Sequence, residues 1–135
     1  MDLILDSRTR AQLRRLDPWE VRGAYRWVQD AKQSPDLAGV EDARLMALTP
    51  LVAEVREDSG KPLGVALRGV NENRIRRLLA SDREDIVEQL ARAVRLAKRS
   101  VGVADLVATA VFWGDQRRRQ IAADYFGRDA DDAGQ

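Results

Sequence analysis

The sequence predicts an all-α protein, a compact bundle of about six to eight helices. Two observations carry this prediction. Apolar residues recur at positions i, i+3 and i+4 through most of the chain, and no stretch of four residues alternates convincingly between apolar and polar as a half-buried strand would. The chain has 135 residues, of which 44% are hydrophobic and 33% charged, and this is the composition of one ordinary globular domain.

The first half of the chain, about residues 7–57, is predicted to hold the N-terminal helices. Asp6-Ser7 can cap a short helix that is expected to end near Leu16. Asp17-Pro18 places an N-cap aspartate before a proline in the first helical turn, and it starts a second helix that runs to about Lys32. The second helix is expected to bury a stripe of four residues, Val21, Ala24, Tyr25 and Val28.

A third helical region covers about residues 40–57 and contains Pro50. Proline has no backbone N–H to donate, so it must kink this helix or split it. The next residues, 57–62, have the composition of a loop, with serine, glycine and proline close together.

The second half, about residues 62–127, is predicted to hold the C-terminal helices. Asn71 should start a short helix after an apolar turn at residues 63–67, in which Gly64 should allow close helix packing. Asp82 should cap a longer helix that ends at Gly102. A strongly apolar helix from residue 103 to about 113 should follow.

The last predicted helix covers residues 115–126, and Gly127 is its expected C-cap. Its inward residues are expected to be Ile121, Ala122, Tyr125 and Phe126. We therefore expect a single helical domain over residues 1–128, followed by a loose acidic tail at 129–135. The chain lacks cysteine and any apolar run long enough to span a bilayer, so we expect a cytoplasmic protein.

The residue types argue against an enzyme. Histidine and cysteine are both absent, which removes the usual general base, the usual nucleophile and the commonest metal ligands. An acidic cluster at Asp82, Glu84 and Asp85 lies where a helix starts, and there carboxylates cap backbone amides. We therefore expect no catalytic residue, no cofactor and no metal site.

The arginines are the remaining functional signal. Residues 61–119 carry 13 basic and 7 acidic side chains, whereas both ends of the chain are acidic. Arg74 and Arg77 fall three apart on one predicted helix, and a second stripe, at Arg92, Arg95 and Arg99, falls on the next. If these helices pack antiparallel, the two stripes can merge into one positive track that suits a phosphate backbone. Periodicity leaves a second interpretation equally open, a solvated face paired with neighbouring carboxylates.

Three tryptophans, Trp19, Trp27 and Trp113, stand near arginines and could stack on bases. In a small helical domain a tryptophan is more often part of the core or of an interface. We therefore assign all three to the core or an interface.

Several short pieces of the sequence stand in an order and spacing typical of one known family. They are Leu63-Gly64-Val65-Ala66-Leu67, Asn71-Glu72-Asn73-Arg74-Ile75, Leu78-Leu79, Asp82-Arg83, Gln89-Leu90, Arg92, Phe112-Trp113-Gly114 and Asp124-Tyr125-Phe126. With these pieces the sequence resembles the CasB family, the small subunit of the type I-E CRISPR surveillance complex called Cascade. Many relatives carry a basic residue where Val65 stands, and basic residues directly after Trp-Gly, where this chain has Asp115-Gln116.

The resemblance implies two small helical bundles, a non-catalytic role, and two copies head-to-tail in Cascade beside its backbone and large subunits. It implies binding, without sequence readout, to the guide RNA–target DNA duplex and to the displaced non-target strand of the R-loop in antiviral defence. The basic contacts of the family match best at Arg15, Arg74 and Arg92. Helix geometry adds five candidates for nucleic-acid binding: Lys61, Arg77, Arg95, Arg99 and Arg118.

A rival hypothesis is a purely structural adaptor, whose arginines pair with partner subunits and touch no nucleic acid. A steep salt dependence of DNA binding by the isolated protein would favour direct contact. An unrelated helical transcription regulator fits less well, because the sequence contains no convincing helix-turn-helix pair.

Overall fold

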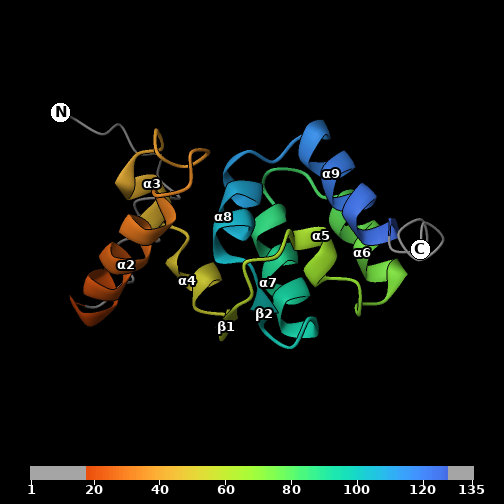
Figure 1. The fold of residues 1–135 in the computed structure, drawn as a ribbon, viewed down its shortest axis with the longest axis horizontal. Coiled ribbons are helices and arrows are strands. Elements are labelled where there is room, and N and C mark those ends of the chain that lie inside the picture. The colour runs from red at the N-terminus through yellow and green to blue at the C-terminus, as the bar shows by residue number, and fades with distance from the viewer. Residues whose placement is uncertain (1–17, 128–135) are drawn as a thin grey trace.

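The fold is all-α, as predicted (Figure 1). The computed structural model describes residues 18–127. Eight helices lie in this part of the chain: α2 (Pro18–Ala31), α3 (Asp42–Met46), α4 (Thr49–Val52), α5 (Leu63–Ala66), α6 (Glu72–Leu79), α7 (Ile86–Leu96), α8 (Val103–Val111) and α9 (Asp115–Phe126). None of them is long and apolar enough to cross a membrane.

Some predictions lie outside the described residues. They are the helix over residues 7–16, the candidate Arg15, the side chain of Trp19 and the acidic tail at 129–135. The extent of the single domain, residues 1–128, therefore stays a prediction.

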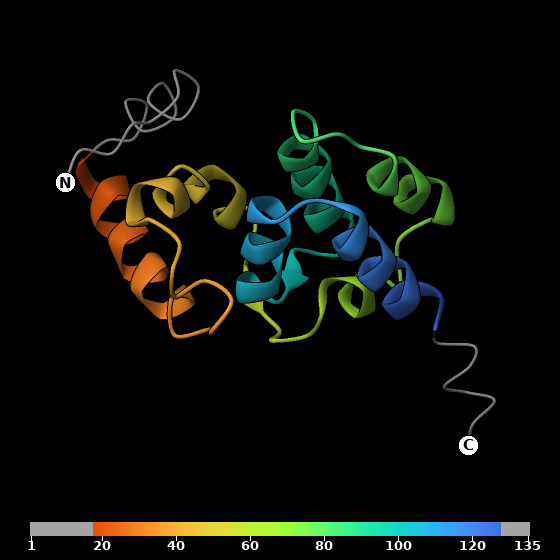
Figure 2. The same ribbon diagram turned by 90° about the horizontal axis from the view of Figure 1, so that it is seen from above.

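The described helices surround two apolar clusters, one at each end of an elongated molecule (Figures 1 and 2). The first cluster joins Val28 of α2, Leu37 of the following loop and Leu45 of α3. The second and larger cluster is built from α5, α6, α7 and α9. Helix α8 serves both, because Val107 packs in the first cluster and Leu106 in the second. An apolar helix buried on both sides explains why the segment 103–111 is so hydrophobic.

Pro50 splits the third helical region, as one of the two expected outcomes. It stands in the first turn of α4, where backbone N–H groups have no partner within the helix, so the missing N–H of proline costs no hydrogen bond. Helix α3 ends at Met46, and α4 begins three residues later at Thr49. Trp27 is half-buried, and its Nε1 donates to Thr49 Oγ1 at 3.1 Å, which ties α2 to the start of α4. The assignment of Trp27 to packing is therefore confirmed.

Two aromatic residues predicted to be buried are exposed. Tyr25 on α2 is 52% exposed and Phe126 at the end of α9 is 43% exposed, although Val28 and Tyr125 on the same helices are buried. Helical spacing alone cannot distinguish the edge of an apolar stripe from its centre, because the packing partner decides how much of the stripe is covered.

The prediction of a pure loop at residues 57–62 is wrong. Glu57–Asp58 (β1) pairs in parallel with Ser100–Val101 (β2), and the carbonyl of Arg99 accepts hydrogen bonds from the N–H groups of Arg56 and Glu57. The pairing of β1 with β2 also explains why α7 ends at Leu96 rather than at the predicted Gly102. The chain has to leave the helix and change direction before it enters β2 at Ser100. The turn places Lys98 and Arg99 in the left-handed region, with φ of 58° and 59°.

Asn71 starts α6, as predicted. Its side-chain oxygen accepts a hydrogen bond from the N–H of Asn73 at 2.8 Å, the geometry of an N-cap. Asp82 acts differently from its prediction. Its Oδ1 accepts from the N–H groups of Glu84 and Asp85, so it caps the turn at residues 83–85, and α7 begins only at Ile86. A side-chain cap therefore stands on each side of the short helix α6, Asn71 at its start and Asp82 in the turn that follows it.

Candidate nucleic-acid interface

Arg74 and Arg77 share one surface of α6. Both line a cavity of about 420 Å³ together with residues 69–71, Asn73 and Leu96 at the end of α7. Arg77 is exposed and Arg74 is half-buried. Within residues 18–127 neither guanidinium group has a hydrogen-bond or ion-pair partner. The donors of both side chains are therefore available to an anion from outside.

Arg95 and Arg99 turn instead toward a carboxylate of their own chain. Arg95 contacts both oxygens of Glu54 at 2.9 and 3.0 Å, and Arg99 Nη1 donates to Glu54 Oε2 at 2.6 Å. The Arg95 hydrogen bonds, followed by those of Arg99, hold the pKa of Glu54 below its ordinary value although partial burial opposes this shift. The same carboxylate raises the pKa of Arg95. Glu54 follows α4, which packs on α7, so these two arginines face α4.

Arg92 has the simplest surroundings of the α7 arginines. Its Nη2 lies 2.8 Å from Glu88 Oε1, one turn earlier on the same helix, and both side chains are about half exposed or more. An exposed i, i+4 pair of this kind contributes about 0.3–0.5 kcal/mol. A phosphate could exchange for Glu88 at little cost.

Arg118 is part of an internal clamp. Its Nη2 and the Nε1 of Trp113 both donate to the carbonyl oxygen of Ser81 at 2.8 Å, and its guanidinium carbon lies 5.1 Å from the centre of the Trp113 ring. A further bond joins its Nη1 to Asp115. Its Nε is buried and has no partner within the described part of the chain. These contacts hold the turn that joins α6 to α7, and the assignment of Trp113 to the core is confirmed by its 3% exposure.

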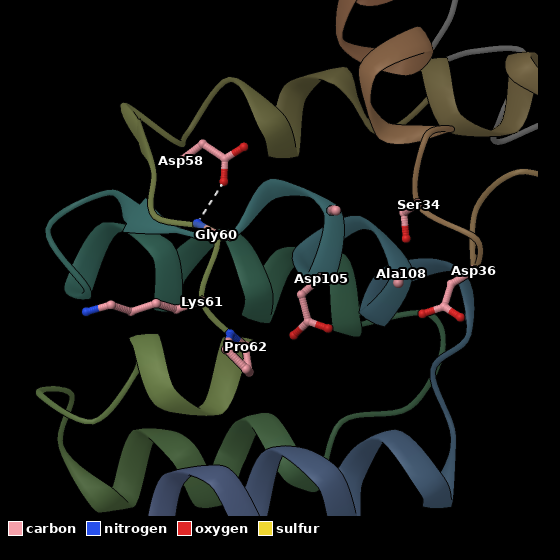
Figure 3. A pocket seen from close by; sticks show the side chains of 10 residues that line it. Ser34, Asp36, Asp58, Gly60, Lys61, Pro62, Asp105 and Ala108 are labelled. Atoms are coloured by element: carbon pink, nitrogen blue, oxygen red, sulfur yellow. Dashed lines mark hydrogen bonds between the residues drawn. The ribbon is translucent and has the colours of Figure 1, made fainter.

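Lys61 lies apart from the other candidates, beside a cleft of about 320 Å³ between the two ends of the molecule (Figure 3). The ammonium group of Lys61 points away from the carboxylate of Asp105 in this view. The carboxylates that line the cleft have partners within the chain. Asp58 Oδ1 accepts from the N–H groups of Gly60 and Val103, Asp105 accepts from Leu63 N–H and Arg117, and Asp36 lies 3.8 Å from Arg117. No group of acidic residues in residues 18–127 has the arrangement of a metal site.

The predicted single track of arginines is thus divided. Arg74 and Arg77 remain open on the α6 side of α7, whereas Arg95 and Arg99 are occupied on the α4 side. Sequence reasoning missed Glu54, which lies 41 residues before Arg95. No local pattern could have found it, because the contact depends on how α4 packs against α7.

The Glu54 cluster leads to a prediction about pH. Because the folded protein lowers the pKa of Glu54 from its ordinary value of 4.5, the ionised carboxylate stabilises the fold above that pKa, and this contribution is lost as pH falls through the lower folded pKa. Glu54→Gln should therefore lower the thermal unfolding midpoint by a few degrees at pH 7, and the difference from wild type should shrink below about pH 4. Melting curves across pH measure this, with Glu88→Gln as the matched control. If the difference in unfolding midpoint between Glu54→Gln and wild type stays constant with pH, the ionised Glu54 carboxylate is not what stabilises the fold.

The fold and the site define a small helical protein with two apolar clusters and with two arginines, Arg74 and Arg77, that have no partner within residues 18–127. The sequence profile of the CRISPR-associated protein Cse2 matches residues 9–126, and the chain belongs to this family. This finding confirms the resemblance to the CasB family.

A solved structure agrees with the family. The chain is similar to a protein in the crystal structure of E. coli Cascade bound to a PAM-containing dsDNA target, with 27% sequence identity and a TM-score of 0.53. The alignment covers 90% of this chain and 87% of the other. A search of curated proteins finds no match.

Proposed function

We propose that this chain is a non-catalytic small subunit of a type I-E Cascade complex, and that it binds nucleic acid backbones without reading sequence. Its role is to stabilise the guide RNA–target DNA duplex and the displaced strand of the R-loop. The family and the likeness to a protein of DNA-bound E. coli Cascade support this proposal. In such systems base pairing reads the sequence, and protein contacts to the backbone stabilise the near-balanced exchange of strands.

One observation carries the proposal at the level of residues. Arg74 and Arg77 lie on one surface with no carboxylate partner within the described residues, in a chain where Arg92, Arg95 and Arg99 all have one. Arginine binds phosphate through paired hydrogen bonds, and the counterions it displaces favour association. We therefore rank Arg74 and Arg77 first as phosphate contacts and Arg92 next.

We rank the remaining candidate nucleic-acid contacts below these three arginines. Lys61 and Arg15 stay proposed contacts, the first at the cleft and the second outside the described residues. Arg95, Arg99 and Arg118 can reach phosphate only by leaving internal partners. The proposed protein partners are the backbone and large subunits of Cascade and a second copy arranged head-to-tail.

The adaptor function is the second candidate. The 52% exposure of Tyr25 on α2 favours it, because a large aromatic side chain at the surface is typical of a contact with another protein. The adaptor needs no open arginines, so the two functions differ in what happens when Arg74 and Arg77 are removed.

The double change Arg74→Ala, Arg77→Ala tests the proposal. Affinity for single-stranded DNA should fall to a similar extent for all sequences. The slope of log affinity against log salt should decrease by about 0.7 for each phosphate that the variant no longer neutralises. Titrations at several ionic strengths measure both quantities.

Arg76→Ala is the matched control, because Arg76 lies on the same helix and pairs with Glu72 at 3.6 Å. It should change the salt slope less than the double variant does. Circular dichroism should show intact helicity in every variant. If the folded double variant has the same affinity and the same salt slope as wild type, direct binding through these arginines is rejected and the adaptor function is favoured.

A further inference from the structure

A second cavity adjoins the one that holds the open arginines. It has a volume of about 580 Å³ and is lined by Arg68, Glu72, Tyr125 and Phe126. Residues 69–71 line both cavities. Both hollows therefore border the loop before α6, one on the side of the end of α7 and the other on the side of the end of α9. We call the two hollows together the α6 groove.

Phe126 is the unexplained residue of the α6 groove. It occupies the last turn of α9, yet 43% of it is exposed, and the inward prediction for it is wrong. Its ring stands edge-to-face against Tyr125, with centroids 4.8 Å apart and planes at 88°. Tyr125 is fixed, because it is buried and its hydroxyl donates to the carbonyl of Val70 at 2.5 Å. Phe126 is thus an exposed aromatic ring held against a rigid support.

Charge is distributed unevenly along the α6 groove. Arg74 and Arg77 stand at the α7 end without partners in the described residues. At the α9 end the lining holds one carboxylate and one guanidinium group. Glu72 lies 3.6 Å from Arg76, and Arg68 Nε donates to the carbonyl oxygen of Asp124 at 2.9 Å. An anionic group therefore fits the α7 end, and a neutral, flat group fits the ring at the α9 end.

We propose that the α6 groove binds one segment of single-stranded DNA, with phosphates at Arg74 and Arg77 and an unpaired base stacked on Phe126. The proposal rests on the proposed function and extends it by naming a site for the base. A base has a flat face whatever its identity, so stacking on a phenyl ring adds affinity without adding sequence preference. A paired base keeps its faces inside the duplex, so the site favours an unpaired strand.

The test compares two oligonucleotides of equal length, oligothymidylate and the same phosphate backbone with abasic sites. Phe126→Ala should weaken binding of oligothymidylate about tenfold and leave the abasic strand nearly unchanged. Phe112→Ala is the matched control, because Phe112 is 45% exposed but lines a different cavity, with Asp36 and Asp105. It should leave both affinities unchanged. The double change Arg74→Ala, Arg77→Ala should weaken both strands.

A further variant guards against an effect on folding. Phe126→Trp retains a stacking ring, so it should keep the affinity of wild type, and its added fluorescence should be quenched by oligothymidylate and not by the abasic strand. If Phe126→Ala leaves the two affinities unchanged or lowers both equally, the stacking site is rejected. If the arginine variant has no effect on either strand, the proposed function itself is rejected, whatever Phe126 does.

Discussion

Gly64→Leu is expected to lower the free energy of unfolding by about 3 kcal/mol or more, the upper range for overpacking in a core. The reason is the close approach of α5 to α9. A Cβ atom at Gly64 would lie 2.5 Å from the carbonyl oxygen of Ile121 and 2.6 Å from the Cβ of Asp124. Both atoms belong to α9 and neither is the end of a flexible side chain, so the helices themselves must move apart.

Thermal unfolding measures this effect, and the midpoint should fall by on the order of 10 °C. Gly39→Ala is the control, because an added Cβ at Gly39 meets nothing within 4 Å. Gly64→Ala should already be destabilising, since its Cβ alone produces the collision. If Gly64→Leu kept full stability but abolished DNA binding, the glycine would serve the ligand and not the packing of α5 on α9.

Trp113→Ala is the second change with a large expected effect. Truncation of a buried tryptophan typically costs about 3–5 kcal/mol. Trp113 is 3% exposed, it contributes to the larger apolar cluster, and its Nε1 donates to Ser81. The variant should lose the support of the turn between α6 and α7 as well as apolar packing.

Denaturant titration measures this destabilisation, and Trp113→Phe separates its two parts. Phenylalanine keeps most of the apolar volume but cannot donate to the Ser81 carbonyl, which still accepts from Arg118. The phenylalanine variant should therefore be destabilised much less than the alanine variant. Equal destabilisation of the two variants would show that the hydrogen bond, and not burial, is the main contribution.

The Trp113 prediction concerns one of the contacts that hold α6 in place. Helix α6 carries Arg74 and Arg77, its start is capped by Asn71, and its end is fixed by the contacts of Trp113 and Arg118 with Ser81. A phosphate site gains affinity when its donors are held in position before binding. The rigid surroundings of α6 thus suit the proposed role of its two open arginines.

Much of the helical structure could be predicted from the sequence because its causes are local. The Asn71 cap depends on residues two positions apart, and the division at Pro50 depends on a single missing N–H. The last helix occupies residues 115–126 as predicted, because its start after Gly114 and its end before Gly127 are both marked in the sequence.

The sequence by itself determined that the protein is helical, that it carries its positive charge in the middle of the chain, and which family it resembles. Only the tertiary structure decided which arginines are open. Glu54 pairs with both Arg95 and Arg99, which lie 41 and 45 residues further along the chain, and the β1–β2 pairing that ends α7 spans a similar distance. Local patterns set which face of a helix is polar, but the element packed beside that face decides whether a charge meets a partner or the solvent.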